Sequence, residues 1–381
     1  MHIAWLGKKS PFCGNVTYSR EVTNALLTNH RVSFLHFAQE ESVGDIWPGC
    51  PEVPLPFLYK SQVYTIPTFK SSKVLMESLR GLKPDLIHAS LTLSPLDFLL
   101  PEICEELSLP LVATFHTPYA RKGAKFKSGT QFLAYQLYAP FLANYDQVIV
   151  FSEIQRELLV KMGVSAPQVA VIPNGVDVEK YSPGPSNLKS EFNAERIFVY
   201  QGRIAPEKNV EALLRAWRQA KMGPQCKLLI VGDGPLRLAL EPFYDEEQGI
   251  IWLGYVADEQ RRIDILRGAD VFILPSLAEG LSLSLLEAMA CGVACVATDV
   301  GADGEVLEDG AGIIVNPQRV KTELQTFLPL LRDHPEFTAR LGQKARARVV
   351  ERYTLRRNIA QLEKLYDQVL EQRKFLFSRH A

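Results

Sequence analysis

The chain has 381 residues, of which 47% are hydrophobic and 22% charged, and its formal net charge is −1. A chain of this length can form two domains that each bury a core of their own, and a near-zero net charge lacks the overall basicity of nucleic-acid-binding proteins. No two of the six cysteines are spaced as Cys-X-X-Cys, and no apolar run approaches the length of a membrane-spanning helix. We therefore expect a reduced, cytoplasmic protein that is soluble or peripheral to a membrane.

The first half of the chain alternates apolar strands with helical patterns. His2–Gly7 and 31–37 are predicted strands, with a helix from Thr17 between them, and further strands are predicted at 84–88, 111–116, 147–152 and 168–172. This βαβ rhythm predicts a parallel sheet. Ligands bind at the carboxyl edge of such sheets, where His116 and Ser152 lie. His116 has two possible readings, a structural group with satisfied hydrogen bonds or a ligand contact.

Two segments of the first half carry aromatic or basic residues outside the strand pattern. Residues 44–73 are expected to be irregular, with aromatic residues interleaved among lysines and prolines, and 121–127 contain four basic residues and no acid. The aromatic residues can pack inward and the basic residues can form a solvated loop. Alternatively, segments 57–73 and 121–127 can lie at a membrane surface, where such side chains partition well.

The pattern restarts after Pro173-Asn174-Gly175, a strong turn signal. We expect an N-terminal domain over 1–173, a second domain over 174–355 and a C-terminal helix over 356–381 that packs back towards the first domain. Strands are predicted at 197–202, 226–231, 250–254, 271–274, 293–298 and 312–315, and helices at 213–222 and 263–268.

The stretch from Val271 to Gly292 is the most informative part of the second half. After a buried strand come Glu279-Gly280 and then Leu281–Ala290, whose composition favours a helix, with Glu287 two turns inside it. Free amides at a helix start bind anions, and carboxylates bind hydroxyls, which fits a nucleotide-sugar. In the simpler interpretation, Glu279 interacts favourably with the dipole at the start of the helix, and Glu287 is a solvated side chain within it.

Two more loops are predicted to leave the same edge of the second sheet. Arg203 and Lys208 follow the strand at 197–202 and suit a diphosphate, while Gly254-Tyr255 follow another strand and suit a flat base. A nicotinamide dehydrogenase would need a Gly-X-Gly-X-X-Gly motif, which the chain lacks. A nucleotide-sugar-binding module without activity remains an alternative.

Five segments together resemble the retaining GT-B glycosyltransferases of family 4: 172–177, 202–209, 231–235, 253–256 and the Glu-X7-Glu of 279–287. The resemblance implies an α/β GT-B fold, in which two Rossmann-like doubly wound domains face a central cleft. It also implies a UDP-sugar donor and no metal, with positive side chains in the role of the ion. The loop 299–304 departs from the family in lacking adjacent glycines.

The resemblance also implies roles for particular residues. Arg203 and Lys208 would bind the diphosphate, Glu287 the ribose, Glu279 the sugar, and His116 the sugar from the other domain. The implied catalytic residues are His116, Arg203, Lys208 and Glu279. The implied donor-binding residues are Gly14, Ser152, Gly202, Gly254, Tyr255, Gly280, Leu281, Ser282, Leu283 and Glu287.

Residues 5–18 and 34–39 resemble a narrower group within the family, the digalactosyldiacylglycerol synthases of cyanobacteria. This resemblance implies that UDP-galactose is the donor and that the acceptor is monogalactosyldiacylglycerol at a membrane surface. A different UDP- or GDP-sugar with another lipid or a soluble acceptor is the alternative.

Overall fold

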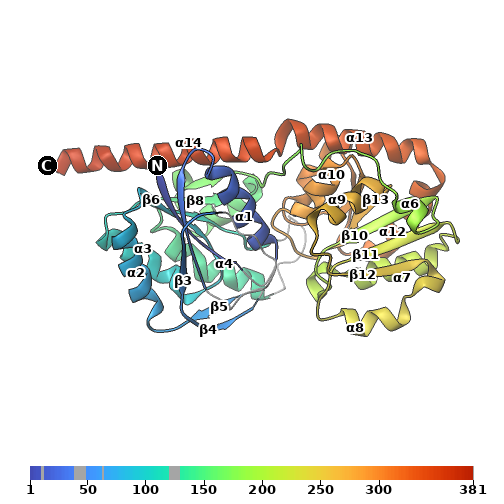
Figure 1. Cartoon of the computed structure of the whole chain (residues 1–381), viewed down its shortest axis with the longest axis horizontal. Helices are drawn as coiled ribbons and strands as arrows, with labels where there is room; N and C mark the ends of the chain where they lie inside the picture. Colours follow the sequence, from blue (N-terminus) through green and yellow to red (C-terminus); the bar gives the residue numbers. More distant parts are fainter. Residues whose placement is uncertain (10–12, 38–48, 62–63, 120–128, 381) are drawn as a thin grey trace. The chain divides into compact units, whose positions relative to one another are not determined.

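The computed structural model describes residues 1–9, 13–37, 49–61, 64–119 and 129–380 (Figure 1). The chain forms two compact units. Unit 1 comprises Met1–Thr117, Lys125–Asn174 and Arg356–Ala381, and unit 2 comprises Pro118–Ala124 and Gly175–Leu355. The basic segment 121–127 lies outside the described residues.

Unit 1 is built on a parallel sheet with the strand order β3-β2-β1-β6-β7-β8-β9. The strands are β1 (His2–Gly7), β2 (Arg31–Phe37), β3 (Glu52–Leu55), β6 (Leu86–Ser90), β7 (Leu111–Thr114), β8 (Gln147–Val150) and β9 (Val169–Val171). Every residue of β1, β6 and β7 is buried, as expected for strands covered by helices on both faces. The order reverses between β1 and β6, and such a reversal is where doubly wound sheets bind ligands.

The expectation that residues 44–73 are irregular is wrong for much of their described part. They include β3 and a separate antiparallel hairpin of β4 (Phe57–Lys60) and β5 (Thr65–Pro67). Strand β3 lies at the edge of the sheet, and an edge strand tolerates proline because one side of its backbone needs no ladder partner. Pro54 inside the strand and the flanking Pro51 and Pro56 make the sequence look irregular although the strand pairs with β2.

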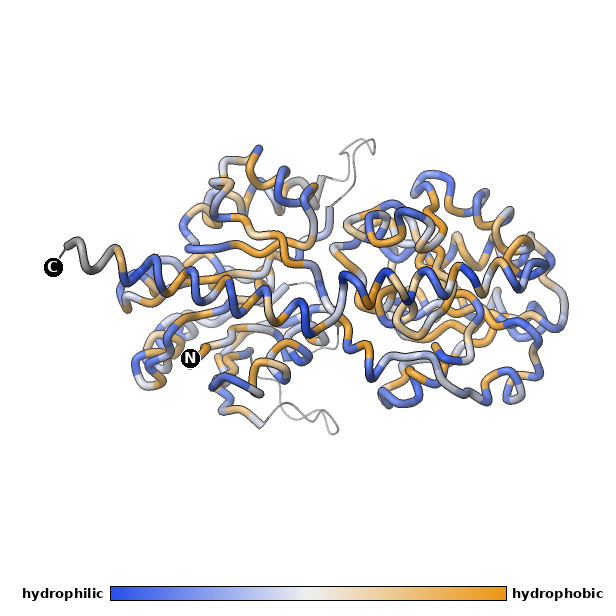
Figure 2. The backbone as a smooth tube through the Cα atoms, turned by 90° about the horizontal axis from the view of Figure 1, so that it is seen from above, coloured by the Kyte–Doolittle hydropathy of each residue, from blue (hydrophilic) through white to orange (hydrophobic). Residues whose placement is uncertain are grey.

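Among the described residues, six α-helices belong to unit 1, and Figure 1 labels all of them except α5. They are α1 (Gly14–Leu26), α2 (Ser71–Leu82), α3 (Pro95–Glu106), α4 (Gly129–Leu142), α5 (Glu153–Lys161) and α14 (Leu355–His380). Hydrophilic and hydrophobic residues alternate along α14, which ends near the C-terminus (Figure 2). Its Tyr366 is fully buried, and the Tyr366 hydroxyl lies 2.6 Å from His88 Nδ1 in β6. Helix α14 therefore belongs to the core of unit 1.

Unit 2 repeats the same plan with the strand order β12-β11-β10-β13-β14-β15, again all parallel. The strands are β10 (Arg196–Gln201), β11 (Cys226–Val231), β12 (Ile250–Gly254), β13 (Val271–Leu274), β14 (Ala294–Thr298) and β15 (Ile313–Val315). The order reverses between β10 and β13. The loops after these two strands therefore leave the sheet edge at a switch point, where ligands bind in this architecture.

The helices of unit 2 are α6 (Leu188–Glu191), α7 (Val210–Ala220), α8 (Arg237–Leu240), α9 (Glu259–Gly268), α10 (Leu283–Ala290), α11 (Asp303–Val306), α12 (Val320–Asp333) and α13 (Pro335–Arg352). Helix α10 begins two residues later than predicted because Ser282 is its N-cap. Helix α9 begins four residues earlier than predicted because Asp258 caps it. Within the described ranges, no helix is long and apolar enough to cross a membrane.

Candidate functional site

The loops that follow β10 and β13 are tied together at the switch point of unit 2. The amide of Leu277 donates to the carbonyl of Glu207 over 2.7 Å, and Asn209 Nδ2 donates to the carbonyl of Pro275 over 3.2 Å. Asn209 has a left-handed φ of 51°, which ends the short 3-10 turn at Pro206–Lys208 and starts α7. These hydrogen bonds join the two loops into one cluster of polar side chains.

Lys208 and Glu279 form the central ion pair of this cluster. Lys208 Nζ lies 2.5 Å from Glu279 Oε1, and the Ser276 hydroxyl donates to the same oxygen over 2.7 Å. Glu279 is only 8% exposed. A buried carboxylate needs such partners, because an unpaired charge would be costly to bury. The structure thus brings together two of the residues predicted from different loops.

Arg203 lies in the first of the two loops and forms an ion pair with Glu207. The Tyr200 hydroxyl donates to the carbonyl of Arg203 over 2.7 Å, which fixes the backbone there. Partial burial raises the pKa of Glu207, but the hydrogen bond from Arg203 and the charges of Arg203 and Lys208 outweigh burial and lower it below its ordinary value. Glu207 is therefore an ionised partner that orients Arg203, a role that sequence reasoning did not assign.

Glu287 projects from α10 towards the end of β10. Gln201 Nε2 donates to Glu287 Oε2 over 3.0 Å, and both side chains are largely buried. The predicted Glu-X7-Glu pair is thus divided between two environments, with Glu279 beside Lys208 and Glu287 beside Gln201.

Asp303 is a site residue that sequence reasoning missed. It is completely buried, and its Oδ1 accepts a 2.9 Å hydrogen bond from the amide of Ser282. Its Oδ2 is buried without a hydrogen-bond partner among the described residues. Burial, followed by the charge of Glu279, raises the pKa of Asp303 well above its ordinary value, which favours a protonated carboxyl. The available signal was its position after β14, at the same sheet edge.

The backbone of Glu279 and Gly280 is held by the segment that includes Gly301. The amide of Ala302 donates to the carbonyl of Gly280 over 2.7 Å. Tyr119 links the two segments, because its amide donates to Glu279 and its carbonyl accepts from Gly301. Gly301 has φ +56°, and a Cβ there would lie 2.3 Å from the carbonyl oxygen of Glu279. Only glycine fits this close approach.

Glycines also shape the ends of β10, β11 and β12. The amide of Gly232 donates to the carbonyl of Gly254 over 2.7 Å, and a Cβ on Gly232 would lie 1.9 Å from the carbonyl oxygen of Gly202. Gly254 has φ +67°, and the neighbouring Tyr255 is half exposed. The three strand ends therefore pack backbone to backbone.

The N-terminus of α10 differs in detail from the predicted anion site. The Ser282 hydroxyl accepts from the amide of Leu285 as the helix cap, and the Ser282 amide donates to Asp303. The amides of Leu283 and Ser284 are the remaining first-turn groups that a helix leaves without a carbonyl of its own. Any anion at this helix start would therefore meet Leu283 and Ser284 before Ser282.

In unit 1, His116 lies just after β7 in a hydrogen-bond chain that fixes its tautomer. Asn15 Nδ2 donates to the carbonyl of Leu91, so the Asn15 Oδ1 accepts from the Ser90 hydroxyl over 2.6 Å. The Ser90 oxygen must then accept from His116 Nε2, which lies 2.9 Å away. The imidazole therefore carries its proton on Nε2 and keeps an acceptor lone pair on Nδ1.

His116 is also held as a neutral group. Burial, followed by the positive charge of Lys8, lowers the pKa of His116 to about 3. Its ring packs edge-on against Tyr18 at a centroid distance of 4.9 Å. The side chain is thus suited to accept a hydrogen bond from a hydroxyl near neutral pH, and unsuited to act there as a cation.

Ser152 and Gly14 lie at helix starts of unit 1. The buried Ser152 hydroxyl caps α5 by accepting from the amide of Gln155 over 3.2 Å. Gly14 is the exposed first residue of α1, and a Cβ on it would meet nothing within 4 Å. Packing therefore explains Ser152 but gives no reason for glycine at position 14. In the described part of the chain, no group of three or more His, Cys, Asp or Glu side chains is placed to hold a metal ion.

Two family models match the chain. One described as "Glycosyltransferase Family 4" matches residues 14–180, and one described as "Glycosyl transferases group 1" matches residues 195–333. Together they cover most of the sequence, and the second match contains the loop cluster of unit 2.

Curated relatives agree with these models. The chain is 29% identical to the UDP-Gal:alpha-D-GlcNAc-diphosphoundecaprenol alpha-1,3-galactosyltransferase of Escherichia coli, over 71% of this chain and 69% of the relative. It is 26% identical to sulfoquinovosyl transferase SQD2 of Arabidopsis thaliana, over 92% of this chain and 68% of the relative. The chain spans between 50% and 69% of the length of the curated relatives compared.

A solved structure supports the fold independently. The structure of HepE of Anabaena in complex with UDP-glucose is similar with a TM-score of 0.75 and 21% identity, covering 97% of this chain and 100% of that one. At this identity the likeness establishes the GT-B fold. The two Rossmann-like sheets, the two family models and the relatives lead to one conclusion: the chain belongs to the GT-B glycosyltransferases of family 4.

Proposed function

We propose that the protein is a retaining galactosyltransferase that moves galactose from UDP-galactose to monogalactosyldiacylglycerol and so forms digalactosyldiacylglycerol. The observation that carries the donor part is the cluster at the switch point of unit 2, where Lys208 and Glu279 lie 2.5 Å apart beside the start of α10. A family 4 enzyme with another UDP- or GDP-sugar and a different acceptor is the alternative.

The charges of the cluster support a diphosphate ligand. Arg203 offers a planar guanidinium and Lys208 a compact ammonium, and both come from the loop after β10. We assign to them the two phosphates of the donor and the negative charge that grows on the leaving UDP. Preorganised positive charge of this kind usually contributes more to the rate of such reactions than any other single effect.

The carboxylates of the cluster support the sugar and ribose contacts. Glu287 is held by Gln201 at the end of β10, and we assign it to the ribose hydroxyls. Glu279 is held by Lys208 and Ser276, and we assign it to hydroxyls of the transferred sugar. We assign the base to the neighbourhood of Gly254 and Tyr255, and the remaining close backbone contacts to Gly14, Gly202, Gly280, Leu281 and Leu283. That galactose is the sugar rests on the resemblance of residues 5–18 and on the UDP-Gal donor in the name of the E. coli relative.

The neutral state of His116 supports a contact to a sugar hydroxyl. Its Nδ1 is an acceptor because Nε2 carries the proton, so a hydroxyl of the donor sugar can donate to it. A neutral imidazole also avoids adding positive charge beside the oxocarbenium-like centre that forms in glycosyl transfer. The retaining outcome itself is proposed from the family resemblance.

The acceptor part of the proposal is supported by exposed apolar side chains in unit 1. In and beside the β4–β5 hairpin, Leu58 is 69% exposed and Phe69 is completely exposed, with Lys70 and Lys73 next to them. Helix α4 adds Leu133 and Leu137, spaced by one turn and both more than half exposed. Apolar side chains flanked by lysines are typical of surfaces that bind an anionic membrane interface.

Two experiments test the donor and membrane parts separately. Calorimetry should show that UDP binds more tightly than GDP and that Lys208→Ala weakens UDP binding. Co-sedimentation should show binding to vesicles that contain monogalactosyldiacylglycerol, weakened by Leu58→Ser with Phe69→Ser. A matched control replaces two exposed apolar residues of unit 2, Phe337 and Val350, with serine. If all proteins stay in the supernatant, the lipid acceptor is wrong and a soluble acceptor replaces it.

A further inference from the structure

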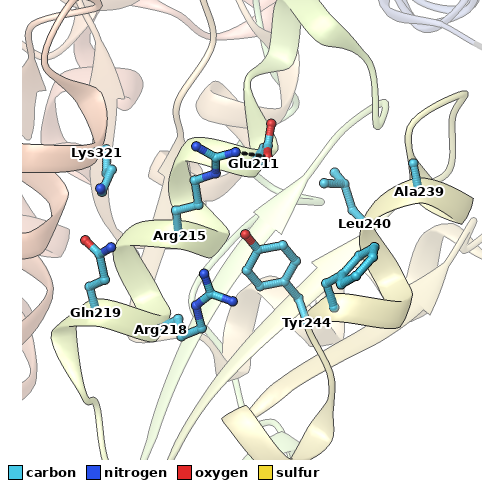
Figure 3. Close-up of a pocket in the computed structure, with 9 residues that line it drawn as sticks. Glu211, Arg215, Arg218, Gln219, Ala239, Leu240, Tyr244 and Lys321 are labelled. Atoms are coloured by element: carbon cyan, nitrogen blue, oxygen red, sulfur yellow. Dashed lines mark hydrogen bonds and ion pairs between the residues drawn. The ribbon is translucent and has the colours of Figure 1, made fainter.

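A basic cleft lies in unit 2 outside the donor cluster (Figure 3). It has a volume of about 390 Å³ and is lined by α7, by the segment from Ala239 to Tyr244 and by the start of α12. Three of its lining side chains are cationic, Arg215, Arg218 and Lys321, and one is a carboxylate, Glu211. Its charge is therefore positive overall.

The single carboxylate of the cleft already forms an ion pair with one of the three cations. Glu211 Oε1 accepts from Arg215 over 2.5 Å, one turn along α7. Arg218 lies over the ring of Tyr244, 5.2 Å from its centroid, and within the described ranges neither Arg218 nor Lys321 forms a hydrogen bond or ion pair with another residue. Both cations line the same cleft, so an anion bound there would be attracted by both.

The other side chains that line the cleft indicate the chemistry of the rest of the ligand. The ring of Phe243 is 65% exposed, and Leu240 and the ring of Tyr244 form a buried wall, with the Tyr244 side chain hydrogen-bonded to Arg215. Gln219 presents an amide whose oxygen accepts from Gln325 on α12. An anion attached to an apolar or planar body would satisfy the cations and cover the exposed ring together.

Arg218, which we assign to the anion in the cleft, lies well apart from Lys208 of the donor cluster. Lys208 ends the turn before α7, whereas Arg218 lies in the third turn of that helix. With a rise of 1.5 Å per residue, Arg218 lies roughly 12 Å along the helix axis from Val210, the first residue of α7 after Lys208 and Asn209. One phosphate group cannot contact both.

We propose that this cleft is a second anion-binding site, which takes the phosphate group of a ligand with an apolar or planar part. Arg218 and Lys321 bind the phosphate, Tyr244 orients Arg218, and Phe243 covers the attached body. The source is either a soluble phosphorylated metabolite or the headgroup of an anionic lipid. This proposal does not depend on the donor sugar or the acceptor.

The test uses the full chain and inorganic pyrophosphate in isothermal titration calorimetry. Arg218→Gln with Lys321→Gln should weaken one binding component at least tenfold and leave the affinity for UDP within twofold. Lys208→Ala should leave that component unchanged. The matched control is Arg340→Gln with Lys344→Gln, which removes two exposed charges from α13. An equal loss in this control, or no loss in the cleft variant, overturns the proposal.

A second arm identifies the source of the phosphate. Phosphatidylcholine vesicles with and without phosphatidylglycerol are mixed with the wild type, the cleft variant and the α13 control. If the cleft variant alone loses its preference for phosphatidylglycerol, the site binds a lipid headgroup. If that preference is unchanged while pyrophosphate binding is lost, the site binds a soluble phosphate. Either vesicle result is consistent with an anion site in the cleft, and only the calorimetry can overturn the existence of that site.

Discussion

Lys208 Nζ lies 2.5 Å from Glu279 Oε1, so the cation of the loop after β10 and the carboxylate of the loop after β13 are directly paired. The two residues are 71 positions apart in the sequence. Their pairing places a positive and a negative group side by side at the switch point, and our proposal assigns the first to a phosphate and the second to sugar hydroxyls of the donor.

Replacing Lys208 with alanine should lower turnover at least tenfold, because removing one electrostatic stabiliser of the transition state costs about 2–4 kcal/mol. Steady-state kinetics with saturating acceptor measures the effect. Glu279→Gln is the matched variant, since it keeps the shape of the partner and removes its charge. Turnover of Lys208→Ala within twofold of the wild type would contradict the assignment.

Replacing Asp303 with asparagine should change the free energy of unfolding by less than about 1 kcal/mol. Burial and the charge of Glu279 raise the pKa of Asp303, so a neutral amide resembles its protonated form and still accepts from Ser282. Asp303→Ala should cost about 1–3 kcal/mol, because it leaves the Ser282 amide unsatisfied. Urea unfolding compares the two variants. Equal destabilisation by both would show that the carboxyl is ionised in the folded protein and that its charge is needed.

Replacing Gly301 with alanine should destabilise unit 2 by about 1–3 kcal/mol, because the left-handed φ of 56° and the carbonyl of Glu279 leave no room for a Cβ. The control is Gly14→Ala, where a Cβ would meet nothing within 4 Å. We expect no loss of stability in the control. Thermal unfolding of the two variants under the same conditions distinguishes them, and similar midpoints would refute the close packing at Gly301.

The buried His88 predicts a loss of stability in acid. Burial, followed by the neighbouring His116, lowers the pKa of His88 to about 3 from its ordinary value of 6.5. The unfolded chain therefore binds a proton that the folded chain does not between these values. The contribution of His88 to the free energy of unfolding is therefore fully present above pH 6.5 and is lost as the pH falls below this value. Between pH 7 and pH 4 the loss is on the order of 3 kcal/mol.

His88→Gln removes this titrating group, and the comparison with wild type isolates its contribution. We expect the free energy of unfolding of the variant to depend less steeply on pH between 4 and 6.5, although the variant is less stable at pH 7. Urea titrations at several pH values give both quantities. Identical slopes for the two proteins would mean that His88 titrates normally in the folded state.

Much of the architecture was predictable, because strands buried on both faces of a parallel sheet consist of uninterrupted apolar residues. Val271–Leu274 is an example, and such a run is recognisable from the sequence. The edge strand β3 was missed for the opposite reason, because Pro54 within it is untypical of a strand, and an edge strand tolerates proline since it needs only one partner. Helix α10 was predicted two residues too long at its start, because the capping role of Ser282 depends on which amide its hydroxyl reaches.

The site was predictable only in part. Arg203, Lys208, Glu279 and Glu287 follow strand ends or sit in the helix beyond one, so their position at one edge follows from the sheet rule. Asp303 could not be assigned, since its role depends on complete burial and on the charge of a residue 24 positions earlier. Likewise, the tautomer of His116 depends on Asn15 and Ser90, which come from two other segments.

Product analysis tests the proposed activity most directly. The purified protein is incubated with UDP-galactose or UDP-glucose and vesicles that contain monogalactosyldiacylglycerol, and the lipid product is examined by nuclear magnetic resonance. We predict a digalactosyl lipid with an α-anomeric signal, formed from UDP-galactose and not from UDP-glucose. A β-anomeric product would contradict the retaining mechanism, and the absence of any lipid product from either donor would contradict the proposed acceptor.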